Sequence, residues 1–404
     1  MVLTPEEEAI LAGSRGDAAR RALQYQIEVG RFWGAKRFVP VTSVHMMGDI
    51  EVMGDAGLAW LKEEARIGGR CAVPTTTNAR CVDFAHCERL GQDAGEVAKE
   101  REIIATLRRM DVVTTDTCIN YQTVYQPHLG EHVAWGDTGT VIYANSVFGA
   151  RSNFESGPAA LAAAITGRTP EYGFHLDEHR RGTFAVRLKA NLDDLADWGA
   201  VGKIVGESHQ DYFAVPVFHG FHRTPTADEL KHLGAALASY GSMGMFHFVG
   251  VTPEAPATLP AEEMVIAEKD IAAVYAGYKL GDGDGGLVVF SGPQQSLLEM
   301  KRLAELFHGR QVRGSCFVTT NSAVLAQARD LGYAQAIEKA GVSILQGVCF
   351  YILQNLSPMR ERNRWRNMVS NSAKIVNIIG AHRFNTILRR TADCVEIACT
   401  GKLK

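Results

Sequence analysis

The densest group of reactive side chains in this sequence lies in residues 130–158. Glu131 and His132 form an acid–imidazole pair near the start of this stretch. An apolar run over residues 140–144 predicts a buried strand, and after it comes a polar turn that carries Asn145, Ser146, Arg151, Asn153 and Glu155. Structural needs alone seldom place so many hydrogen-bonding side chains in one strand-to-helix connection. The stretch therefore predicts a site that holds a small polar ligand.

Such groups could support proton transfer and carboxylate binding. His45 and His132 could act as acid or base, although a histidine beside a strand is more often a hydrogen-bonded structural residue. Arg151, together with Asn153 and Ser146, could hold a carboxylate, because a guanidinium binds that group in a bidentate manner. The alternative for Arg151 is a surface ion pair.

Cys118 and Cys349 are thiols that each follow a predicted strand. An iron–sulfur cluster takes thiolate ligands from such loop ends, and three protein thiolates leave one iron open to substrate. The alternative is that both cysteines are packed core residues. The eight cysteines contain no CxxC pair, so neither a zinc ribbon nor a thioredoxin-like site is predicted. The remaining cysteines are expected to be buried or surface thiols without a role.

Lys374 lies between Ser372 and a predicted helix, where an ammonium group could neutralise an anion or take a proton. The alternative for an isolated lysine is a solvent-facing position. Further hydroxyl groups follow other predicted strands, namely those of Ser43, Thr76 and Thr319. Hydroxyls in such places are candidates to bind a polar substrate.

These candidates need a framework of strands and helices that brings them together. Short strands are predicted over residues 37–44, 71–74, 112–115, 140–144, 183–188, 215–218, 243–249, 287–290, 315–319, 342–345 and 394–398. Helices are predicted over residues 5–32, 57–65, 94–110, 159–165, 227–239, 297–307 and 323–329. Thr4 and Thr226 are predicted N-caps, and residues 280–286 form a predicted flexible boundary.

The alternation of short strands with longer helices predicts an α/β fold with mostly parallel sheets. In such sheets ligands collect at the carboxyl ends of the strands. That rule groups the segments around His45, Thr75, Cys118, Asn145, Ser291, Thr319, Cys349 and Ser370. A GxGxxG spacing at Gly281, Gly283 and Gly286 leads into a strand instead of following one, so it does not predict a dinucleotide site.

The composition is that of an ordinary globular protein. The 404 residues contain 46% hydrophobic and 22% charged residues, and the formal net charge is −3. This charge gives no electrostatic case for binding to nucleic acid or to an anionic membrane. No apolar run approaches the roughly 20 residues of a membrane span, and the acidic N-terminus lacks the plan of a signal peptide. The expected compartment is therefore the cytoplasm.

A series of longer motifs occurs in an order that identifies a family. They include LTPEEEAILAG, VPVTSVHMMGD, GDAGLAWL, VPTTTNARCVDF, GEHVAWGDTGTVIYANSVFGARSNFESGP, AAAITGRTPEYGFHLDEHR, SMGMFHFVGVTPEAP and SNSAK. In this order they resemble the large, catalytic part of aconitase X, a branch of the aconitase superfamily. The resemblance covers nearly the whole chain and implies an aconitase-like α/β fold with α/β/α layers and mostly parallel sheets.

The resemblance implies a dehydratase, that is, a hydro-lyase that uses an iron–sulfur cluster as a Lewis acid. The chain is similar to cis-3-hydroxy-L-proline dehydratases of bacteria and to mevalonate 5-phosphate dehydratases of archaea. The segment SMGMFHFVGVTPEAP and Thr319, where the archaeal type is expected to have a cysteine, favour cis-3-hydroxy-L-proline as the substrate. The alternatives are another small hydroxy acid, such as mevalonate 5-phosphate, and a non-catalytic subunit that has lost its cluster.

The cluster ligands that the resemblance implies are only partly present. Cys118 and Cys349 fall at metal-binding positions of the family. A third position, in a Gly-Cys-Pro-His-like turn, reads Ser291-Gly292-Pro293-Gln294 here and lacks both the thiol and the imidazole. Cys316 is predicted to point away from Thr319, because strand residues three apart face opposite sides. A [2Fe–2S] cluster with a non-cysteine ligand is therefore favoured over a [4Fe–4S] cluster, and a mononuclear metal or no metal are alternatives.

The resemblance also assigns roles to the candidate residues. Lys374 and Ser372 are expected near the reacting carbon, with His45 or His132 as the proton-transfer group. The expected substrate-binding residues are Ser43, Thr76, Asn145, Ser146, Arg151, Asn153, Glu155 and Thr319.

The resemblance further implies a division into domains and a partner. Aconitase-like α/β domains are expected over residues 1–205 and 206–404. The family's swivelling domain has no counterpart in these residues, so we expect it as a separate small subunit. The active site would then lie at the interface of the two subunits, where it would receive a small hydroxy acid.

Overall fold

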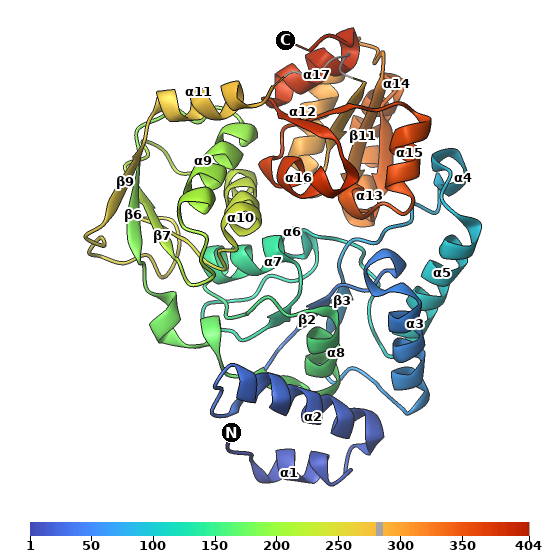
Figure 1. Ribbon diagram of the computed structural model, residues 1–404, viewed down its shortest axis with the longest axis vertical. Helices are drawn as coiled ribbons and strands as arrows, with labels where there is room; N and C mark the ends of the chain where they lie inside the picture. The colour runs from blue at the N-terminus through green and yellow to red at the C-terminus, as the bar shows by residue number, and fades with distance from the viewer. Residues whose placement is uncertain (280–285, 404) are drawn as a thin grey trace.

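The computed structural model describes residues 1–279 and 286–403. Its elements form three lobes, each around its own parallel sheet, and the chain begins and ends at opposite ends of the long axis (Figure 1). The predicted boundary over residues 280–286 falls outside the described residues, apart from Gly286. The α/β fold with mostly parallel sheets is confirmed.

The first lobe contains a parallel sheet in the order β3-β2-β4 and an antiparallel pair, β1 with β5. Its strands are β1 (Phe38–Pro40), β2 (Val44–Met46), β3 (Thr75–Thr77), β4 (Ala134–Trp135) and β5 (Arg168–Pro170). Its helices are α1 (Pro5–Leu11), α2 (Gly16–Phe32), α3 (Ile50–Arg66), α4 (Cys87–Leu90), α5 (Ala94–Arg109), α6 (Asn120–Thr123), α7 (Thr138–Tyr143) and α8 (Gly157–Thr166). Helix α8 packs between α2 and strand β2 (Figure 1).

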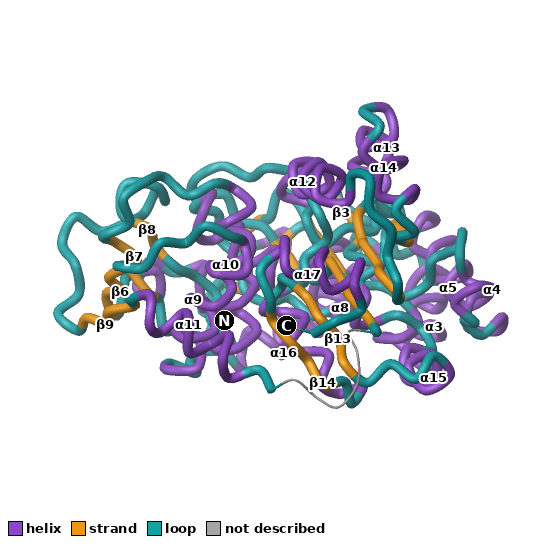
Figure 2. Tube along the Cα trace, turned by 90° about the horizontal axis from the view of Figure 1, so that it is seen from above, coloured by secondary structure: helices purple, strands orange, loops and turns teal. Residues whose placement is uncertain are grey.

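The second lobe holds a parallel sheet in the order β8-β7-β6-β9, which Figure 2 shows gathered at one end of the molecule. Its strands are β6 (Phe184–Leu188), β7 (Pro216–His219), β8 (His247–Phe248) and β9 (Glu263–Ile266), and its helices are α9 (Leu195–Ser208), α10 (Ala227–Gly241) and α11 (Glu268–Gly277). Helices α9 and α10 approach closely where Gly206 meets Gly241. A Cβ on Gly206 would lie 2.9 Å from the backbone nitrogen of Gly241.

The third lobe holds a five-stranded parallel sheet in the order β12-β11-β10-β13-β14. Its strands are β10 (Leu287–Phe290), β11 (Ser315–Thr320), β12 (Ser343–Gln346), β13 (Asn367–Ser370) and β14 (Asn385–Leu388). Its helices are α12 (Leu297–Phe307), α13 (Ser322–Asp330), α14 (Tyr333–Lys339), α15 (Leu356–Arg362), α16 (Ala373–Ile378) and α17 (Thr391–Thr400). Crossover helices cover both faces of such a sheet, which explains why its strands are continuous apolar runs.

Several predicted elements are confirmed. The bounds of β10 and α12 match the predicted residues, and α5 ends one residue early. Thr4 and Thr226 cap their helices in capping boxes with Glu7 and Glu229. These elements carry strong local signals, because a hydroxyl at the N-cap and a glutamate three residues later satisfy two free backbone donors.

Other predicted elements are wrong. The strand predicted over 140–144 is α7 followed by a π-helical turn over Ala144–Phe148, and the strand predicted over 394–398 is part of α17. Both segments are buried, and a short buried helix has the same unbroken apolar run as a buried strand. The single helix predicted over 5–32 is broken between α1 and α2, where Gly13 and Gly16 have φ of +94° and +83°.

Four further predicted strands are shortened or displaced. The strand predicted over 37–44 is divided between β1 and β2, which belong to different sheets. Only β8 forms within residues 243–249, and β3 begins just after the predicted residues 71–74. Residues 112–115 contribute one isolated bridge, from Val113 to Thr76. Pairing partners far away in the chain decide these boundaries, and local sequence does not contain them.

The predicted domain boundary between residues 205 and 206 falls inside α9, between the paired strands β6 and β7. Where the domains divide stays a prediction. Among the described residues, no helix is long and apolar enough to cross a lipid bilayer.

Two buried carboxyl groups lie together at the start of α3. Asp49 caps the helix by accepting a hydrogen bond from the backbone N–H of Val52 at 3.1 Å, and Glu100 accepts one from the N–H of Ile50 at 2.8 Å. One oxygen of each carboxyl group has no hydrogen-bond partner among the described residues. Burial, with a smaller contribution from the charge of Glu51, raises the pKa of Asp49 to about 7. Burial, and then the charge of Asp49, raises the pKa of Glu100 to about 8.

We expect the Glu100→Gln variant to be more stable than the parent at alkaline pH. A raised pKa in the fold means that the native state binds more protons than the unfolded chain, so parent stability falls as pH rises through about 5 to about 8. The amide keeps the Ile50 contact without the charge, so its advantage should grow by about 1 kcal/mol or more over that range. Urea unfolding at several pH values measures this difference. Glu102→Gln, on the exposed face of the same helix, is the control and should show no such trend.

Candidate active site

The strand order of the third sheet has a switch point between β10 and β13. Strands β11 and β12 continue on one side of β10, whereas β13 and β14 lie on the other side. At such a switch point the loops that leave the two central strands diverge and open a ligand site at their carboxyl ends. These loops cover residues 291–296 and 371–372. Cys118 of the first lobe contacts the first of these loops, since its N–H donates to Gln294 Oε1 at 3.3 Å.

Lys374 and Asp137 form a buried ion pair next to the second of these loops. Lys374 Nζ lies 3.3 Å from Asp137 Oδ1, and the two side chains are 9% and 14% exposed. Asp137 also caps α7, because its other oxygen accepts hydrogen bonds from the N–H groups of Gly139 and Thr140. Burial lowers the pKa of Lys374, but the charge of Asp137, followed by those of the neighbouring thiols, outweighs burial, and the net pKa is raised. Lys374 is therefore an ammonium ion at neutral pH.

Cys118 and Cys349 lie beside this ion pair, each 7% exposed. Burial, and then its neighbour Cys349, raises the pKa of Cys118 to about 12. Burial raises the pKa of Cys349 to about 11, against the opposing charge of Lys374. As bare side chains both residues are neutral thiols at physiological pH. We call Cys118, Cys349, Lys374 and Asp137 the cysteine–lysine site.

Gln294 joins the two cysteine loops. Its backbone N–H donates to Cys118 Sγ at 3.2 Å, and its side-chain Nε2 donates to the carbonyls of Asp116 and Val348, each at 3.2 Å. Val348 directly precedes Cys349. Together with the bond from the Cys118 N–H, these contacts use both the donor and the acceptor end of the buried amide.

Ser291 and Ser372 complete the loops around the site. Ser291 Oγ accepts hydrogen bonds from Thr319 Oγ1 at 2.7 Å and from the Phe350 N–H at 3.2 Å. Ser372 caps α16 and donates to the carbonyl of Gly292. Thr319 and Ser372, both predicted from the sequence, therefore lie at this site, where they hold loops in place.

His45 lies in β2, next to the same site, and has a free ring nitrogen. Its Nδ1 is 2.8 Å from Thr76 Oγ1, whose hydroxyl can donate onward to the Val44 carbonyl at 3.4 Å. In that arrangement Nδ1 carries the proton and Nε2 is bare. Nε2 is buried and makes no hydrogen bond of good geometry among the described residues, although the Asn78 side chain and the Thr117 backbone lie close enough to raise the pKa of the ring. Burial lowers the pKa of His45 to about 4, although the nearby Asp137 charge opposes this.

His132 and Arg151 lie elsewhere. His132 Nδ1 is 2.8 Å from Nδ1 of the buried His175. Arg151 donates to the His175 carbonyl at 2.8 Å and pairs with Asp177, which is 82% exposed at its side chain. Among the described residues, no contact links this group to the cysteine–lysine site. The geometry therefore gives no support to His132 as the base or to Arg151 as the carboxylate clamp.

Ser43 and the other predicted substrate-binding residues of the 130–158 stretch bind the protein's own groups. Asn153 donates to the Tyr172 carbonyl and accepts from the Phe174 N–H and the Tyr212 hydroxyl. Equivalent contacts within the fold engage Ser43, Asn145, Ser146 and Glu155. All five residues are buried. Their predicted role in substrate binding stays a prediction, while the observed contacts fasten the stretch to the first and second lobes.

Sequence reasoning missed Asp137, Ser291 and Gln294 as members of the site. Asp137 precedes an apolar run, as a helix N-cap does, but the run was assigned to a strand and the signal was lost. Ser291 is predicted only to lie at a strand end, and Gln294 is noted only as a departure from a family motif. Their position next to Cys349 and Cys118 depends on contacts between residues more than 50 positions apart.

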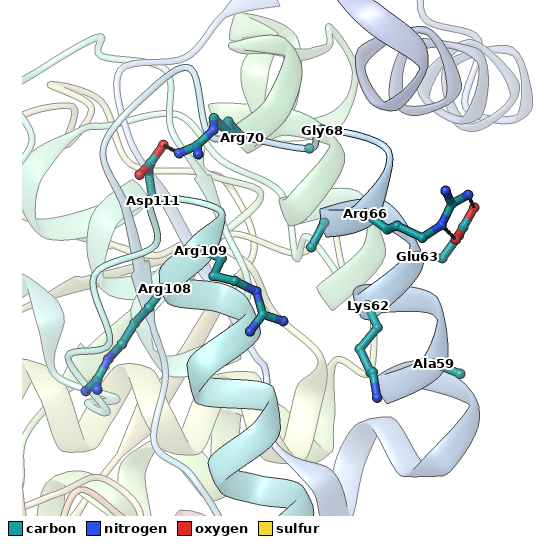
Figure 3. A pocket seen from close by; sticks show the side chains of 11 residues that line it. Ala59, Lys62, Glu63, Arg66, Gly68, Arg70, Arg108, Arg109 and Asp111 are labelled. Carbon is teal, nitrogen blue, oxygen red and sulfur yellow. Dashed lines mark hydrogen bonds and ion pairs between the residues drawn. The ribbon is translucent and has the colours of Figure 1, made fainter.

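A separate hollow of about 800 Å³ lies between the ends of α3 and α5. It is lined by the cationic residues Lys62, Arg66, Arg70, Arg108 and Arg109. Figure 3 shows Arg66 paired with Glu63 and Arg70 with Asp111, and Lys62 pairs with Glu102. Local ion pairs thus neutralise much of its charge, and it shares no residue with the cysteine–lysine site.

Comparison with known proteins identifies the family of this chain. Family models described as the first, second and third domains of aconitase X match residues 1–178, 182–276 and 285–400. The chain belongs to the aconitase X family. Proteins of this family that resemble it carry the names of dehydratases, so the chain is a hydro-lyase by family.

Three aconitase X relatives illustrate the similarity. The phosphomevalonate dehydratase large subunit of Thermococcus kodakarensis is 35% identical over 93% of this chain and 94% of its own length. The cis-3-hydroxy-L-proline dehydratase of Pseudomonas aeruginosa is 30% identical over 98% of this chain and 70% of its own length. The crystal structure of Thermococcus kodakaraensis aconitase X in its holo-form superposes with a TM-score of 0.88, at 32% identity, and covers 98% of this chain and 100% of that one.

The residues at the aconitase X site do not fit an iron–sulfur cluster. Such a cluster needs at least three strong protein ligands, and the site offers two thiols with Ser291, Thr319 and Gln294 around them. Within residues 1–279 and 286–403, no group of three or more histidine, cysteine, aspartate or glutamate side chains is arranged to hold a metal ion. Cys316 lies near Cys399 and not at the site. The predicted [2Fe–2S] cluster therefore finds no ligand set here.

Proposed function

We propose that this chain is the large subunit of a hydro-lyase that dehydrates a small hydroxylated amino acid, with cis-3-hydroxy-L-proline as the first substrate to test. The main support is the buried Lys374–Asp137 ion pair next to His45. A pair of opposite charges complements a zwitterion, because Lys374 can bind a substrate oxygen while Asp137 binds the ammonium group. A relative that is 30% identical carries the name of this activity.

In the proposed reaction His45 and Lys374 act as base and acid. His45 Nε2 takes the proton from the carbon next to the carboxylate, and the C–O bond at the neighbouring carbon breaks. Lys374 protonates the departing hydroxyl group, so water leaves and a carbon–carbon double bond forms. Asp137 keeps the Lys374 ammonium charged and in place. The protons balance within the substrate and these two side chains, without a further reactant.

A second candidate substrate is mevalonate 5-phosphate. It is favoured by the 35% identity to a phosphomevalonate dehydratase large subunit, which extends over nearly the whole of both chains. The same base and acid would serve, because this substrate also loses a hydroxyl group and a proton from neighbouring carbons. Its phosphate would need cations beyond Lys374, which a second subunit would have to supply.

The proposal includes a small-subunit partner and a cytoplasmic location. Several relatives are named large subunits, which supports a partner that carries the swivelling domain. We further propose that this partner closes over the loops at residues 291–296 and 371–372, so that water is excluded during the reaction.

The test is a turnover assay on the complex of this chain with its small subunit. Each candidate substrate is incubated separately, and the unsaturated product is followed by NMR. Dehydration of cis-3-hydroxy-L-proline alone supports the first candidate, and dehydration of mevalonate 5-phosphate alone supports the second. Failure to dehydrate either compound, with no exchange of the substrate proton into deuterated water, rejects the proposed function.

We expect His45→Asn to lower kcat by about 10² to 10⁴, the usual contribution of a general base. The low pKa of His45, about 4, keeps the imidazole neutral at physiological pH, so the acid limb of kcat/KM should lie well below the usual histidine value. The pH–rate profile of the parent complex measures this limb.

His132→Asn is the matched control, because His132 was the alternative base. If His132→Asn loses activity and His45→Asn does not, the roles assigned here are reversed. Thermal unfolding accompanies both variants. His45→Asn should change stability only modestly, because the asparagine amide is also polar and can bond to the groups around the ring, Thr76, Asn78 and the Thr117 backbone.

A further inference from the structure

Hydrogen bonds from one residue tie the two cysteine loops to each other. Gln294 contacts the first loop through Cys118 Sγ, the Cys118 N–H and the Asp116 carbonyl, and the second loop through the Val348 carbonyl. Every polar atom of its amide is engaged, and the side chain is fully buried. In an iron–sulfur protein the cluster itself makes this connection, because its thiolate ligands come from separate loops.

The position where a third thiol is expected from the family resemblance is closed. Gly292 has φ of +61°, and a Cβ there would lie 3.1 Å from Cβ of Ile375. A side chain at this position would strain the left-handed backbone and crowd its neighbour. The adjacent Ser291 hydroxyl is already bonded to Thr319 and to the Phe350 N–H.

A positive charge is nevertheless present beside the thiols. The buried Lys374 ammonium lies within electrostatic reach of Cys118 and Cys349 and is fixed by Asp137 at 3.3 Å. A cation at this place can stabilise the oxygen that departs from the substrate. A Lewis-acidic iron would stabilise the same oxygen in a cluster-containing dehydratase.

We infer that this chain holds its two cysteine loops together with the Gln294 amide in place of an iron–sulfur cluster, so that its active site is complete as protein alone. Gln294 is then a positioning residue for Cys118 and Cys349. Lys374 is the only cation needed at the departing oxygen.

The inference rests on the proposed function only for the role of Lys374. The two can fail separately, because metal content is measured without substrate and turnover is measured without reference to metal. A metal-free complex that dehydrates no substrate would reject the function and keep the inference. An active complex that binds iron through its cysteines would reject the inference and keep the proposed function.

The first experiment measures metal in the complex with the small subunit. The protein is purified without oxygen, treated with iron and sulfide, and desalted, and a protein known to hold a cluster is handled in parallel. We expect iron and acid-labile sulfide well below one per chain and no visible absorption band. At least one iron per chain that Cys118→Ser or Cys349→Ser removes would overturn the inference. Iron that both variants retain is bound elsewhere in the complex and does not contradict the inference.

The second experiment tests Gln294 as the tie between the loops. Gln294→Ala should expose Cys118 to alkylation about tenfold faster or more, because local opening controls the reactivity of a buried thiol. Mass spectrometry of the labelled peptide measures this rate. Gln92→Ala is the matched control, because the buried Gln92 makes the same kind of amide contacts to the backbone of residues 81, 83 and 354.

The control separates positioning from general destabilisation. Both variants lose buried amide contacts and should unfold at lower temperature than the parent, but only Gln294→Ala should change the labelling of Cys118 and Cys349. Equal labelling rates in the two variants would overturn the positioning role. A chelator should leave the melting temperature of the parent unchanged, and a chelator-induced drop that Cys118→Ser abolishes would overturn the metal-free site.

Discussion

Lys374→Met is expected to lower kcat of the complex by about three orders of magnitude, with a smaller change in KM. In the proposed reaction Lys374 donates the proton that converts the departing hydroxyl group into water, and that interaction develops only as the C–O bond breaks. Methionine fills a similar volume with no charge. The ground-state complex should therefore form while the chemical step is slow, which steady-state and single-turnover kinetics can separate.

The ion pair with Asp137 raises the question of whether Lys374→Met still folds. In Lys374→Met the Asp137 carboxylate loses its partner, although it still accepts hydrogen bonds from Gly139 and Thr140 at the start of α7. The fold should therefore survive, and circular dichroism and thermal unfolding check that it does. Asp137→Asn leaves the lysine unpaired, and we expect a smaller loss of activity, because the amide can still cap the helix.

Two further lysine variants serve as comparisons for Lys374→Met. Lys301→Met changes an exposed lysine of α12, 51% exposed at its side chain, and should leave kcat unchanged. Lys374→Arg keeps the positive charge but is a poor proton donor, so it should resemble methionine in kcat while binding substrate more tightly. If Lys374→Met keeps kcat within about tenfold of the parent, the general acid is another group.

The sequence predicted those parts of the site that sit at strand ends. Thr319, Cys349 and Lys374 lie at or just beyond the carboxyl ends of β11, β12 and β13, because parallel strands bring distant segments to one edge. Cys118 reaches the same site from residues that form one isolated bridge and no strand. The rule failed for residues 145–155. There a helix replaces the predicted strand, and the polar side chains face the fold itself.

The reason for that failure is physical. A run of apolar residues indicates that a segment is buried. When every side of the segment faces protein, the run does not indicate whether the segment is a helix or a strand. Amides and hydroxyls in a connection serve buried backbone groups as readily as a ligand, since those groups must be hydrogen-bonded. Asn145 and Asn153 bind backbone carbonyl groups. No local sequence pattern distinguishes this use of an amide from the binding of a ligand.

Lys231→Met is expected to be the most destabilising single change considered, at about 3 to 5 kcal/mol. The Lys231 side chain is fully buried at 0% exposure, and its ammonium pairs with Glu299 and, at 3.1 Å, with Asp228. The nearby carboxylates outweigh burial and raise its pKa. Methionine would leave two carboxylates without a cation in the interior, where charge is poorly solvated.

The contacts of Glu299 make the destabilisation by Lys231→Met hard to relieve. Its carboxylate also accepts from the backbone N–H of Ser296 at the start of α12 and lies 2.8 Å from His232 Nε2. A rotation that exposed it to water would break the cap of that helix. Lys231 also donates to the Gln294 carbonyl at 3.4 Å, so the same change loosens the loop at Cys118.

Urea and thermal unfolding measure the cost, and a drop in melting temperature on the order of 10 °C is expected. A triple variant with Lys231→Met, Glu299→Gln and Asp228→Asn removes the stranded charges and should recover part of the loss. That recovery distinguishes a buried-charge penalty from lost packing, which the triple variant would not repair. If the single change costs less than about 1 kcal/mol, water already reaches this group and the network is not what joins α10 to α12.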